Sequence, residues 1–528
     1  MTLLHPTARV ARGATYLFVQ GFLAAIIGLV YFVVLAHALT KQEMGIFALL
    51  SFILNLPQVL GTFALPSAAI KYISQYLAEN NSQKAKAVVS RVLQMGFLTS
   101  AVVFVLLFIP AERVSSMMFG TDAYAFLLRL LAFCSIFTIL NIEVTSFLQG
   151  MQKMFAVALL GVAYTIISTS LGIYLLYFGL RLYAVVLGWL AGFLIASIAG
   201  LILTIKYLGI LGKPYPVRPL LNFSFPLYVS NGISFWVGWI DQLLLVSYMS
   251  LLPGGVPEAQ RILGIYSVAI RAAAVPTLFS SSIITALFPQ LSELYAQQGL
   301  NGIKDAFRVS IRYSVLIGFP LIVGLATLAY PVIILVGGWQ YIEATEPLII
   351  VSIAALVGTF GVTTGPILMT LEHTKIASVL SVVSVILSFI LSYFALAYLG
   401  LGMIGTAWAR TLASFIGLVL SLYALARYVH VSFDKEAIWK ASVASILIVI
   451  SIVGLDVIRM FLSPSSYHFL EFSLRLLPIY VIVGALAYFA SLAGLKAIKK
   501  HDVELIYEYL PKKMRWIADW LSRIAMVE

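Results

Sequence analysis

Long apolar runs separated by short polar segments dominate the chain. A helix that crosses the hydrocarbon core of a membrane needs about 20 mainly apolar residues, and fourteen runs of this kind are present. The runs do not alternate between polar and apolar positions, as the strands of a membrane barrel would. We therefore predict an all-α polytopic membrane protein with 14 transmembrane helices. The predicted spans are residues 14–38, 44–66, 91–110, 123–146, 155–178, 182–205, 221–247, 262–288, 310–335, 347–370, 375–398, 402–427, 438–460 and 472–495.

The composition agrees with this pattern. Of the 528 residues, 62% are hydrophobic and 10% are charged, whereas about 25% are charged in a soluble domain. The net charge of +12 is interpreted as the cytoplasmic bias of membrane proteins rather than as a nucleic-acid surface. A single cysteine, Cys134, allows no disulfide within the chain and no cysteine-based metal cluster.

The distribution of lysine and arginine predicts the topology. With both termini in the cytoplasm, 24 of the 33 basic residues lie on the cytoplasmic side and 6 on the outer side, as the positive-inside rule requires. We expect a multi-pass protein of the cell membrane, with a cytoplasmic stub before an uncleaved first span. Residues 497–528 form the predicted cytoplasmic tail, whose stripe of Met514, Ile517, Leu521 and Ile524 predicts an amphipathic helix on the inner leaflet. Docking of a partner is the alternative role of this tail.

An internal repeat divides the spans into two sets. Lys153 and Lys375 lie in similar stretches 222 residues apart, and Gly45-Ile-Phe repeats as Gly264-Ile-Tyr after 219 residues. Two pseudo-symmetric six-helix lobes that point the same way are typical of transporters with the substrate path between them. The predicted parts are residues 1–206 (N-terminal lobe), 207–428 (C-terminal lobe), 429–496 (helices 13 and 14) and 497–528 (tail).

Four charged residues fall well inside predicted spans, namely Arg129, Asp241, Arg271 and Arg410. A charge at the middle of a span costs about 2.5–3.5 kcal/mol, so such residues face protein or water. All four are predicted to lie in one layer in the outer half of the membrane. We expect Asp241 to pair with Arg271, either to position the guanidinium in a cavity or as a static ion pair that fixes helix packing.

Uncharged polar residues extend the predicted cavity. Asn231 and Asp241 lie on one face of their span, Asn55 and Gln58 lie on one face of another, and Gln20 is added from the first span. Such stripes line aqueous paths or join neighbouring helices. With the three arginines the cavity is cationic, and the planar guanidinium suits phosphate oxygens. The predicted substrate head group is therefore anionic, with a phosphate or pyrophosphate as the simplest candidate.

Several stretches together resemble a known family. They are LPSAAIKYISQYLAENNSQKAKAVV from Leu65, FSFPLYVSNGISFWVGWIDQLLL from Phe223, LGIYSVAIRAAAVP from Leu263, ALFPQLSELYA from Ala286, and the run that begins LEHTKIASVL at Leu371. In this order the chain resembles the polysaccharide and lipid-linked oligosaccharide flippases. These belong to the superfamily that also holds the multidrug extruders and the lipid II flippases. By position, Lys71, Asp241 and Arg271 fall on charged or polar places of the family pattern.

The resemblance implies a function. A protein of this family would flip an isoprenoid-(pyro)phosphate-linked oligosaccharide from the cytoplasmic to the outer leaflet by alternating access, for the assembly of cell-surface glycans. The implied partners are this lipid-linked anionic glycan, membrane lipids and glycan-assembly enzymes, and we expect a monomer. No cofactor or metal is expected, although Na⁺, H⁺ or the membrane potential could drive the transport.

Other classes fit the residues less well. An ion-coupled drug extruder is the alternative within the superfamily, but an extruder of cations would need an anionic pocket. A catalytic membrane enzyme would carry paired carboxylates, a metal site or a large extramembrane domain, and the outer loops are too short for one. A structural scaffold would not need arginines inside its spans.

Overall fold

The structure is a computed structural model, and it describes residues 6–210, 212–361, 364–371, 373–429, 433–462 and 474–497. Throughout these ranges the chain is helical, with short connections and no strand. The predicted all-α membrane class is confirmed. The predicted amphipathic tail lies outside the described residues.

The chain divides into two compact units, Met1–Ser267 and Val268–Glu528, and the boundary falls within one long helix, α10 (Gly255–Gln298). The lobes expected from the repeat, with their boundary after residue 206, stay a prediction. The other elements of the first unit are α1 (Pro6–Ala38), α2 (Lys41–Leu56), η1 (Pro57–Gly61), α3 (Leu65–Ala78), α4 (Ser82–Phe108), α5 (Ala111–Phe119), η2 (Asp122–Tyr124), α6 (Ala125–Gly150), α7 (Met154–Tyr177), α8 (Arg181–Tyr207) and α9 (Val217–Met249).

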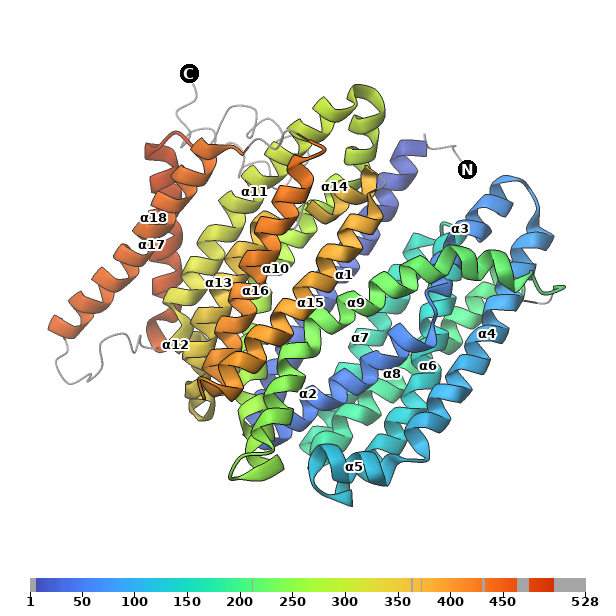
Figure 1. Ribbon diagram of the computed structural model, residues 1–528, viewed down its shortest axis with the longest axis horizontal. Helices are drawn as coiled ribbons and strands as arrows, with labels where there is room; N and C mark the ends of the chain where they lie inside the picture. Colours follow the sequence, from blue (N-terminus) through green and yellow to red (C-terminus); the bar gives the residue numbers. More distant parts are fainter. Residues whose placement is uncertain are drawn as a thin grey trace. The chain divides into compact units, whose positions relative to one another are not determined.

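The second unit continues α10 and adds the C-terminal helices. These are α11 (Leu300–Thr327), α12 (Ala329–Gly337), η3 (Trp339–Ala344), α13 (Thr345–Gly361), α14 (Thr364–Thr370), α15 (Thr374–Ala397), α16 (Gly402–Ala426), α17 (Lys435–Leu462), η4 (Leu474–Leu476) and α18 (Leu477–Gly494). Here α16 packs against α13 and α15, and α11 packs against α13 and α17. Figure 1 shows α17 and α18 side by side at the C-terminal end of the described chain.

Within the described ranges, twelve helical segments are long and apolar enough to cross a membrane. The seventh and eighth predicted spans are not among them, although they lie in α9 and α10, which are helical over 33 and 44 residues. Asn231, Asp241 and Gln242 make α9 less apolar than the other spans. The count of fourteen therefore stays a prediction.

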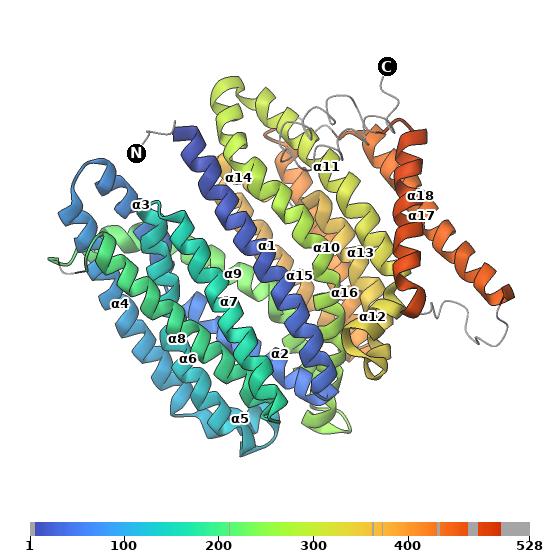
Figure 2. The ribbon, with the colours of Figure 1, turned by 180° about the vertical axis from the view of Figure 1, so that it is seen from behind.

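In the first unit, α7 packs against α1 and α8, and α6 packs against α4 and α8 (Figure 2). The helices α7 and α8 approach very closely, since a Cβ atom added at Gly188 would lie 2.4 Å from the carbonyl oxygen of Ser168. A separate cluster of fully buried apolar residues joins α3, α4, α6 and α9, with Ile73, Val88 and Phe147 among them. These contacts fix the helices that carry the candidate site of this unit.

The second predicted span is interrupted. The helix α2 ends at Leu56, the π-helix η1 begins at Pro57, and Phe63 and Ala64 take left-handed backbone conformations with φ of 48° and 52° before α3 begins. Left-handed backbone is rare for a bulky side chain such as phenylalanine and costs energy. Proline lacks the backbone donor that would continue the ladder of hydrogen bonds. The sequence thus predicted the span but not its division.

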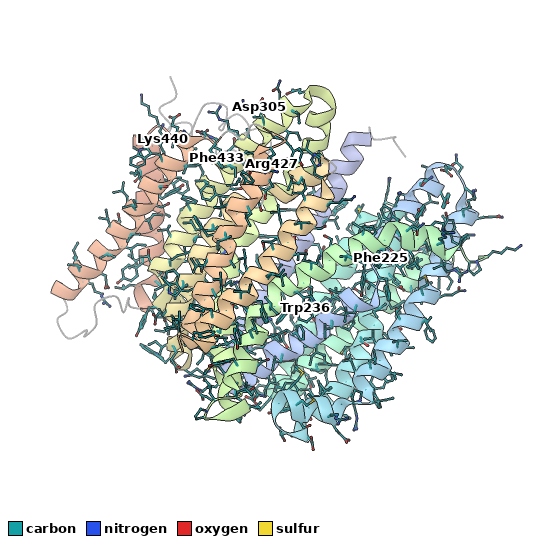
Figure 3. All side chains as sticks on the ribbon, in the orientation of Figure 1. Phe225, Trp236, Asp305, Arg427, Phe433 and Lys440 are labelled. Atoms are coloured by element: carbon teal, nitrogen blue, oxygen red, sulfur yellow. The ribbon has the colours of Figure 1, made fainter. Side chains whose placement is uncertain are left out.

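One end of the second unit is rich in charged side chains. Figure 3 shows Asp305, Arg427, Phe433 and Lys440 at this end of α11, α16 and α17. Nearby, the buried Arg312 donates to Asp434 Oδ2 at 3.0 Å and to the carbonyl oxygen of Ala497 at 2.7 Å. The guanidinium therefore ties α11 to the start of α17 and to the residues that follow α18.

Candidate substrate site

The polar stripe predicted on α9 exists and runs from exposed to buried positions. Asn231 and Ser234 are exposed, Gly238 has open space at its Cβ position, and Asp241 is fully buried. Aromatic side chains lie along the same stretch of α9. The ring of Phe52 on α2 lies 5.5 Å from the rings of both Phe235 and Trp239, measured between centroids. Figure 3 shows Trp236 on this stretch of α9.

Asp241 is held by a tyrosine that the sequence did not single out. The hydroxyl of Tyr266 donates to Asp241 Oδ2 at 3.0 Å, and the Tyr266 side chain is fully buried. Tyr266 is the last residue of the repeated Gly-Ile-Tyr, and its counterpart in the first copy is Phe47. The second copy therefore has an added hydroxyl at this position, and that hydroxyl contacts the carboxylate. The difference between Phe47 and Tyr266 was the signal that could have predicted this contact.

The three predicted arginines lie in different surroundings. Arg271 is exposed on α10, and Arg410 is half-buried on α16. Arg271 belongs to the second unit and Asp241 to the first, so their pairing stays a prediction. Arg129 on α6 forms an ion pair at 2.7 Å with Glu112 on the short helix α5. This partner was missed because Glu112 lies outside the predicted spans, and a cavity role for Arg129 stays a prediction.

Lys71 is exposed on α3 beside the start of α9. Its Nζ lies 4.1 Å from the centre of the Phe223 ring and 5.4 Å from that of Tyr72. A cation over aromatic faces is stabilised by the quadrupoles of the rings. The ammonium group is thus held at the edge of α9 while it stays accessible.

The three amides from the first two spans have mainly local contacts. Asn55 Nδ2 donates to the carbonyl oxygen of Ser51 at 2.7 Å, within α2. Gln58 lies in η1, where its backbone carbonyl accepts the hydroxyl of Thr62 at 2.7 Å. Gln20 packs against α7 so closely that a Cβ atom added at Gly161 would lie 2.6 Å from its Nε2. Their predicted contact with substrate is untested, and Gln20 also contributes to packing.

A buried carboxyl group in the first unit was missed. Glu143 on α6 is 2% exposed, and a Cβ atom added at Gly96 on α4 would lie 1.8 Å from its Oε1. None of the hydrogen bonds or ion pairs found in the described part of the chain involves this carboxyl group. Glu143 lies near the inner end of a predicted span, and an acidic residue in the run FTILNIEVTSF was the available signal.

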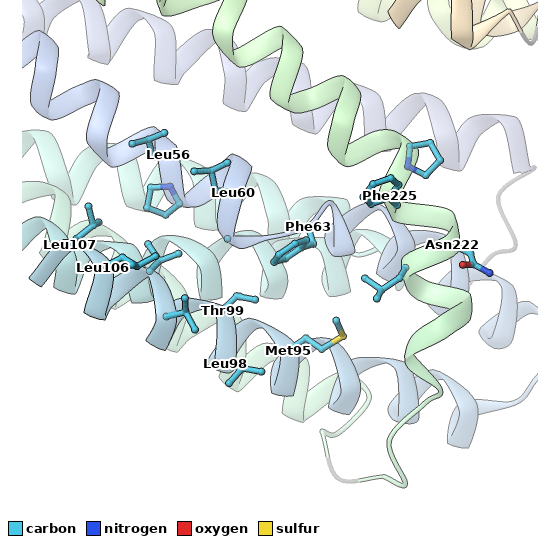
Figure 4. A pocket seen from close by; sticks show the side chains of 16 residues that line it. Leu56, Leu60, Phe63, Met95, Leu98, Thr99, Leu106, Leu107, Asn222 and Phe225 are labelled. Atoms are coloured by element: carbon cyan, nitrogen blue, oxygen red, sulfur yellow. The ribbon is translucent and has the colours of Figure 1, made fainter. Parts of the chain in front are cut away.

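The first unit also contains an apolar cavity of about 910 Å³ (Figure 4). Its walls come from the end of α2 with η1, from α4 and from the start of α9. Only Thr99 and Asn222 among its lining residues are polar, and the Thr99 hydroxyl donates to the carbonyl oxygen of Gly96. In the ranges described, no cluster of histidine, cysteine or acidic residues has the arrangement of a metal site.

These features define a class of protein, a multi-pass α-helical transporter with polar and charged side chains on its spanning helices. Comparison with known proteins then identifies the family. The model of the family described as "Polysaccharide biosynthesis protein" matches residues 10–295, more than half of the chain, and the chain belongs to this family. The expected family and the expectation of a transporter rather than an enzyme are confirmed.

Individual relatives agree with this assignment. The chain is 24% identical over 442 residues to the probable low-salt glycan biosynthesis flippase Agl15 of Haloferax volcanii, covering 83% of this chain and 88% of the relative. Its fold is similar to that of the lipid II flippase MurJ in an inward closed conformation, with a TM-score of 0.68, 20% identity, and coverage of 90% and 97%. An inward-facing multidrug resistance MATE family transporter of the MOP superfamily gives a TM-score of 0.63 at 14% identity, covering 76% and 94%.

Proposed function

We propose that the protein flips an isoprenoid-(pyro)phosphate-linked oligosaccharide from the cytoplasmic to the outer leaflet of the membrane. The observation that carries this proposal is the match to Agl15 along most of both chains, together with the family match. Agl15 is a probable low-salt glycan biosynthesis flippase, and the match covers 88% of its length. The transport cycle is alternating access between two six-helix lobes.

The charges of the candidate site support an anionic head group. Arg271 and Lys71 are exposed cations, and the guanidinium of Arg271 can bind phosphate oxygens in a bidentate way. Asp241, held by Tyr266, provides a fixed carboxylate on α9. An extruder of cationic drugs would need the opposite balance of charge, so we favour the glycan substrate over the drug.

The orientation follows from the distribution of basic residues. Both termini lie in the cytoplasm, and the inside-negative potential favours outward movement of an anion by about 2.3 kcal/mol per charge per 100 mV. Enzymes that assemble the glycan on its lipid carrier supply the substrate at the inner leaflet. One chain contains both lobes and works as a monomer.

A reconstituted assay tests the proposal. Proteoliposomes contain a polyprenyl-pyrophosphate oligosaccharide with a fluorophore on the glycan, and a membrane-impermeant quencher reports the fraction in the outer leaflet. We expect flipping by the wild-type protein, loss in Arg271→Ala, and partial activity in Arg271→Lys. Arg113→Ala on α5 is the matched control, because Arg113 is exposed and lies outside the site. Extrusion of a cationic dye without glycan flipping would overturn the proposal.

A further inference from the structure

We propose that the apolar cavity of the first unit binds the isoprenoid chain of the substrate, with the anionic head group at the end marked by Lys71. This inference rests on the proposed function and adds to it a separate site for the lipid. The cavity lies wholly within the first unit, between η1, α4 and α9. We call this cavity the chain groove, and Figure 4 shows it from close by.

The shape of the chain groove fits a long chain. On α4 its lining residues recur every three or four positions from Met95 to Leu107 and therefore share one face of the helix. At 1.5 Å per residue this face is about 18 Å long, more than half of a hydrocarbon core of about 30 Å. A compact amphiphile would not need an apolar surface of this length.

The two ends of the chain groove differ in polarity. Figure 4 shows Leu106 and Leu107 at one end and Asn222 at the other. Next to Asn222, the ring of Phe223 supports the ammonium group of Lys71 at 4.1 Å. Arg91 lies one helical turn before Met95 on the same face of α4, where its Nε donates to the carbonyl oxygen of Tyr215 at 2.7 Å. Two cations therefore lie at the end that also has an amide, which complements an anionic lipid.

The broken helix forms one wall of the chain groove. Pro57, Leu60, Gly61 and Phe63 all line it. A Cβ atom added at Gly61 would lie 2.5 Å from Ile139 Cδ1, so the glycine lets η1 pack closely against α6. Phe63 keeps its unfavourable φ of 48° and stacks on Tyr228 with 5.1 Å between centroids. Because π-helical turns and strained backbone concentrate at functional sites, this break is an independent indication of a binding site.

Labelling with a photoreactive lipid tests the proposal. The probe is a polyprenyl phosphate without a glycan that carries a benzophenone on its chain, added to the full-length protein in vesicles. We expect cross-links to peptides of α4 between Leu98 and Leu107 and of α9 between Leu221 and Pro226. Val102→Trp fills the groove and is expected to reduce labelling about tenfold, the equivalent of about two methylene groups excluded from the site.

Matched variants separate a specific site from a general effect. Val105→Trp is the control for Val102→Trp, because both valines are on α4 and are 47% and 51% exposed, but Val105 does not line the groove. Val102→Ala should keep wild-type labelling, because it leaves the groove open. Lys71→Gln should weaken labelling by the phosphate probe but not by the uncharged polyprenol. Lys84→Gln should change neither, although Lys84 also lies over a tyrosine ring.

Two outcomes would contradict the binding of the isoprenoid chain in the chain groove. One is equal labelling of Val102→Trp and the wild type. The other is competition by excess phosphatidylglycerol as effective as that by unlabelled polyprenyl phosphate, which would show an ordinary membrane lipid in the groove. Labelling needs neither a glycan nor transport, so it tests the groove separately from the proposed function. If Val102→Trp were labelled like the wild type and still flipped the glycan, only the groove would be rejected. Specific labelling of a wild-type protein that flips no glycan would reject only the proposed function.

Discussion

Gly45 on α2 and Gln260 on α10 are in backbone contact. A Cβ atom added at Gly45 would lie 1.9 Å from the carbonyl oxygen of Gln260, and one added at Gly264 would lie 1.9 Å from the carbonyl oxygen of Lys41. The side chains of Gln42 and Gln260 are joined by a hydrogen bond of 3.1 Å beside this crossing. Gly45 and Gly264 are equivalent positions of the internal repeat, so the two sequence copies meet here through the same residue.

The first prediction concerns this crossing. Gly45→Ala and Gly264→Ala place a methyl group into backbone that cannot move aside like a flexible side chain, and each should destabilise the fold by about 1–3 kcal/mol. Thermal unfolding in detergent measures the loss. Gly28→Ala is the control, because nothing lies within 4 Å of its Cβ position, and it should stabilise α1 by about 0.5–1 kcal/mol. A Gly45→Ala protein as stable as the wild type would show that the helices are further apart.

The second prediction concerns the buried carboxylate of Asp241. Tyr266→Phe restores the aromatic residue of the first copy but removes the hydroxyl that donates to Oδ2, and it should cost about 1–3 kcal/mol. Asp241→Asn alone should also destabilise. Since the two residues share one hydrogen bond, the double variant should cost less than the sum of the single variants. Additive effects in this double-mutant cycle would contradict the contact.

The helices could be predicted from the sequence because lipid imposes a length and an apolar composition on each span. The division of the second span at Pro57 could not, since η1 depends on the packing of Gly61 against Ile139 on α6. The repeat identified Gly45 and Gly264 as equivalents. The repeat did not show that Gly45 lies against Gln260 and Gly264 against Lys41, because a repeat alone does not indicate which surfaces are in contact.

The candidate site shows a similar limit. Asp241 stood out because a carboxylate is costly inside an apolar run, but Tyr266 did not, since tyrosine is common in such runs. The partner of Arg129 was hidden because Glu112 lies on α5, beyond the predicted span. Sequence patterns thus identified the charged residues inside apolar spans. Their partners could not be identified, because these contacts depend on how the helices pack.

The third prediction concerns Glu143 and Gly96. Gly96→Ala should destabilise the fold, because the added methyl group would lie 1.8 Å from Glu143 Oε1 and the buried carboxyl group would have to move aside. Glu143→Ala removes the obstructing carboxyl group and should rescue Gly96→Ala by more than about 1 kcal/mol in a double-mutant cycle. Unfolding in detergent measures both. Gly21→Ala, with open space at its Cβ position, provides the neutral comparison. Failure of Glu143→Ala to rescue would place the carboxyl group elsewhere.

The last prediction concerns the attachment of α17 and α18 to the second unit. Arg312 is 6% exposed and Asp434 is 4% exposed, and the Asp434 Oδ1 atom also accepts the backbone N–H of Ala437 at the start of α17. Asp434→Asn removes the charge that balances the buried guanidinium, and breaking such a pair costs about 3–5 kcal/mol. Replacing both residues, as Arg312→Met with Asp434→Asn, leaves no buried charge and should cost less than Asp434→Asn alone.

The matched control is the pair of half-buried Lys440 and exposed Glu436 on the same helix. Glu436→Gln should change stability by less than about 1 kcal/mol, because Glu436 is exposed and solvent screens its charge. Unfolding monitored in detergent gives the size of each effect. Limited proteolysis between residues 427 and 435 shows whether the loss is local to the attachment of α17. If Asp434→Asn were no more damaging than Glu436→Gln, the guanidinium of Arg312 would have to be solvated, and these two helices would be held to α11 by apolar packing alone.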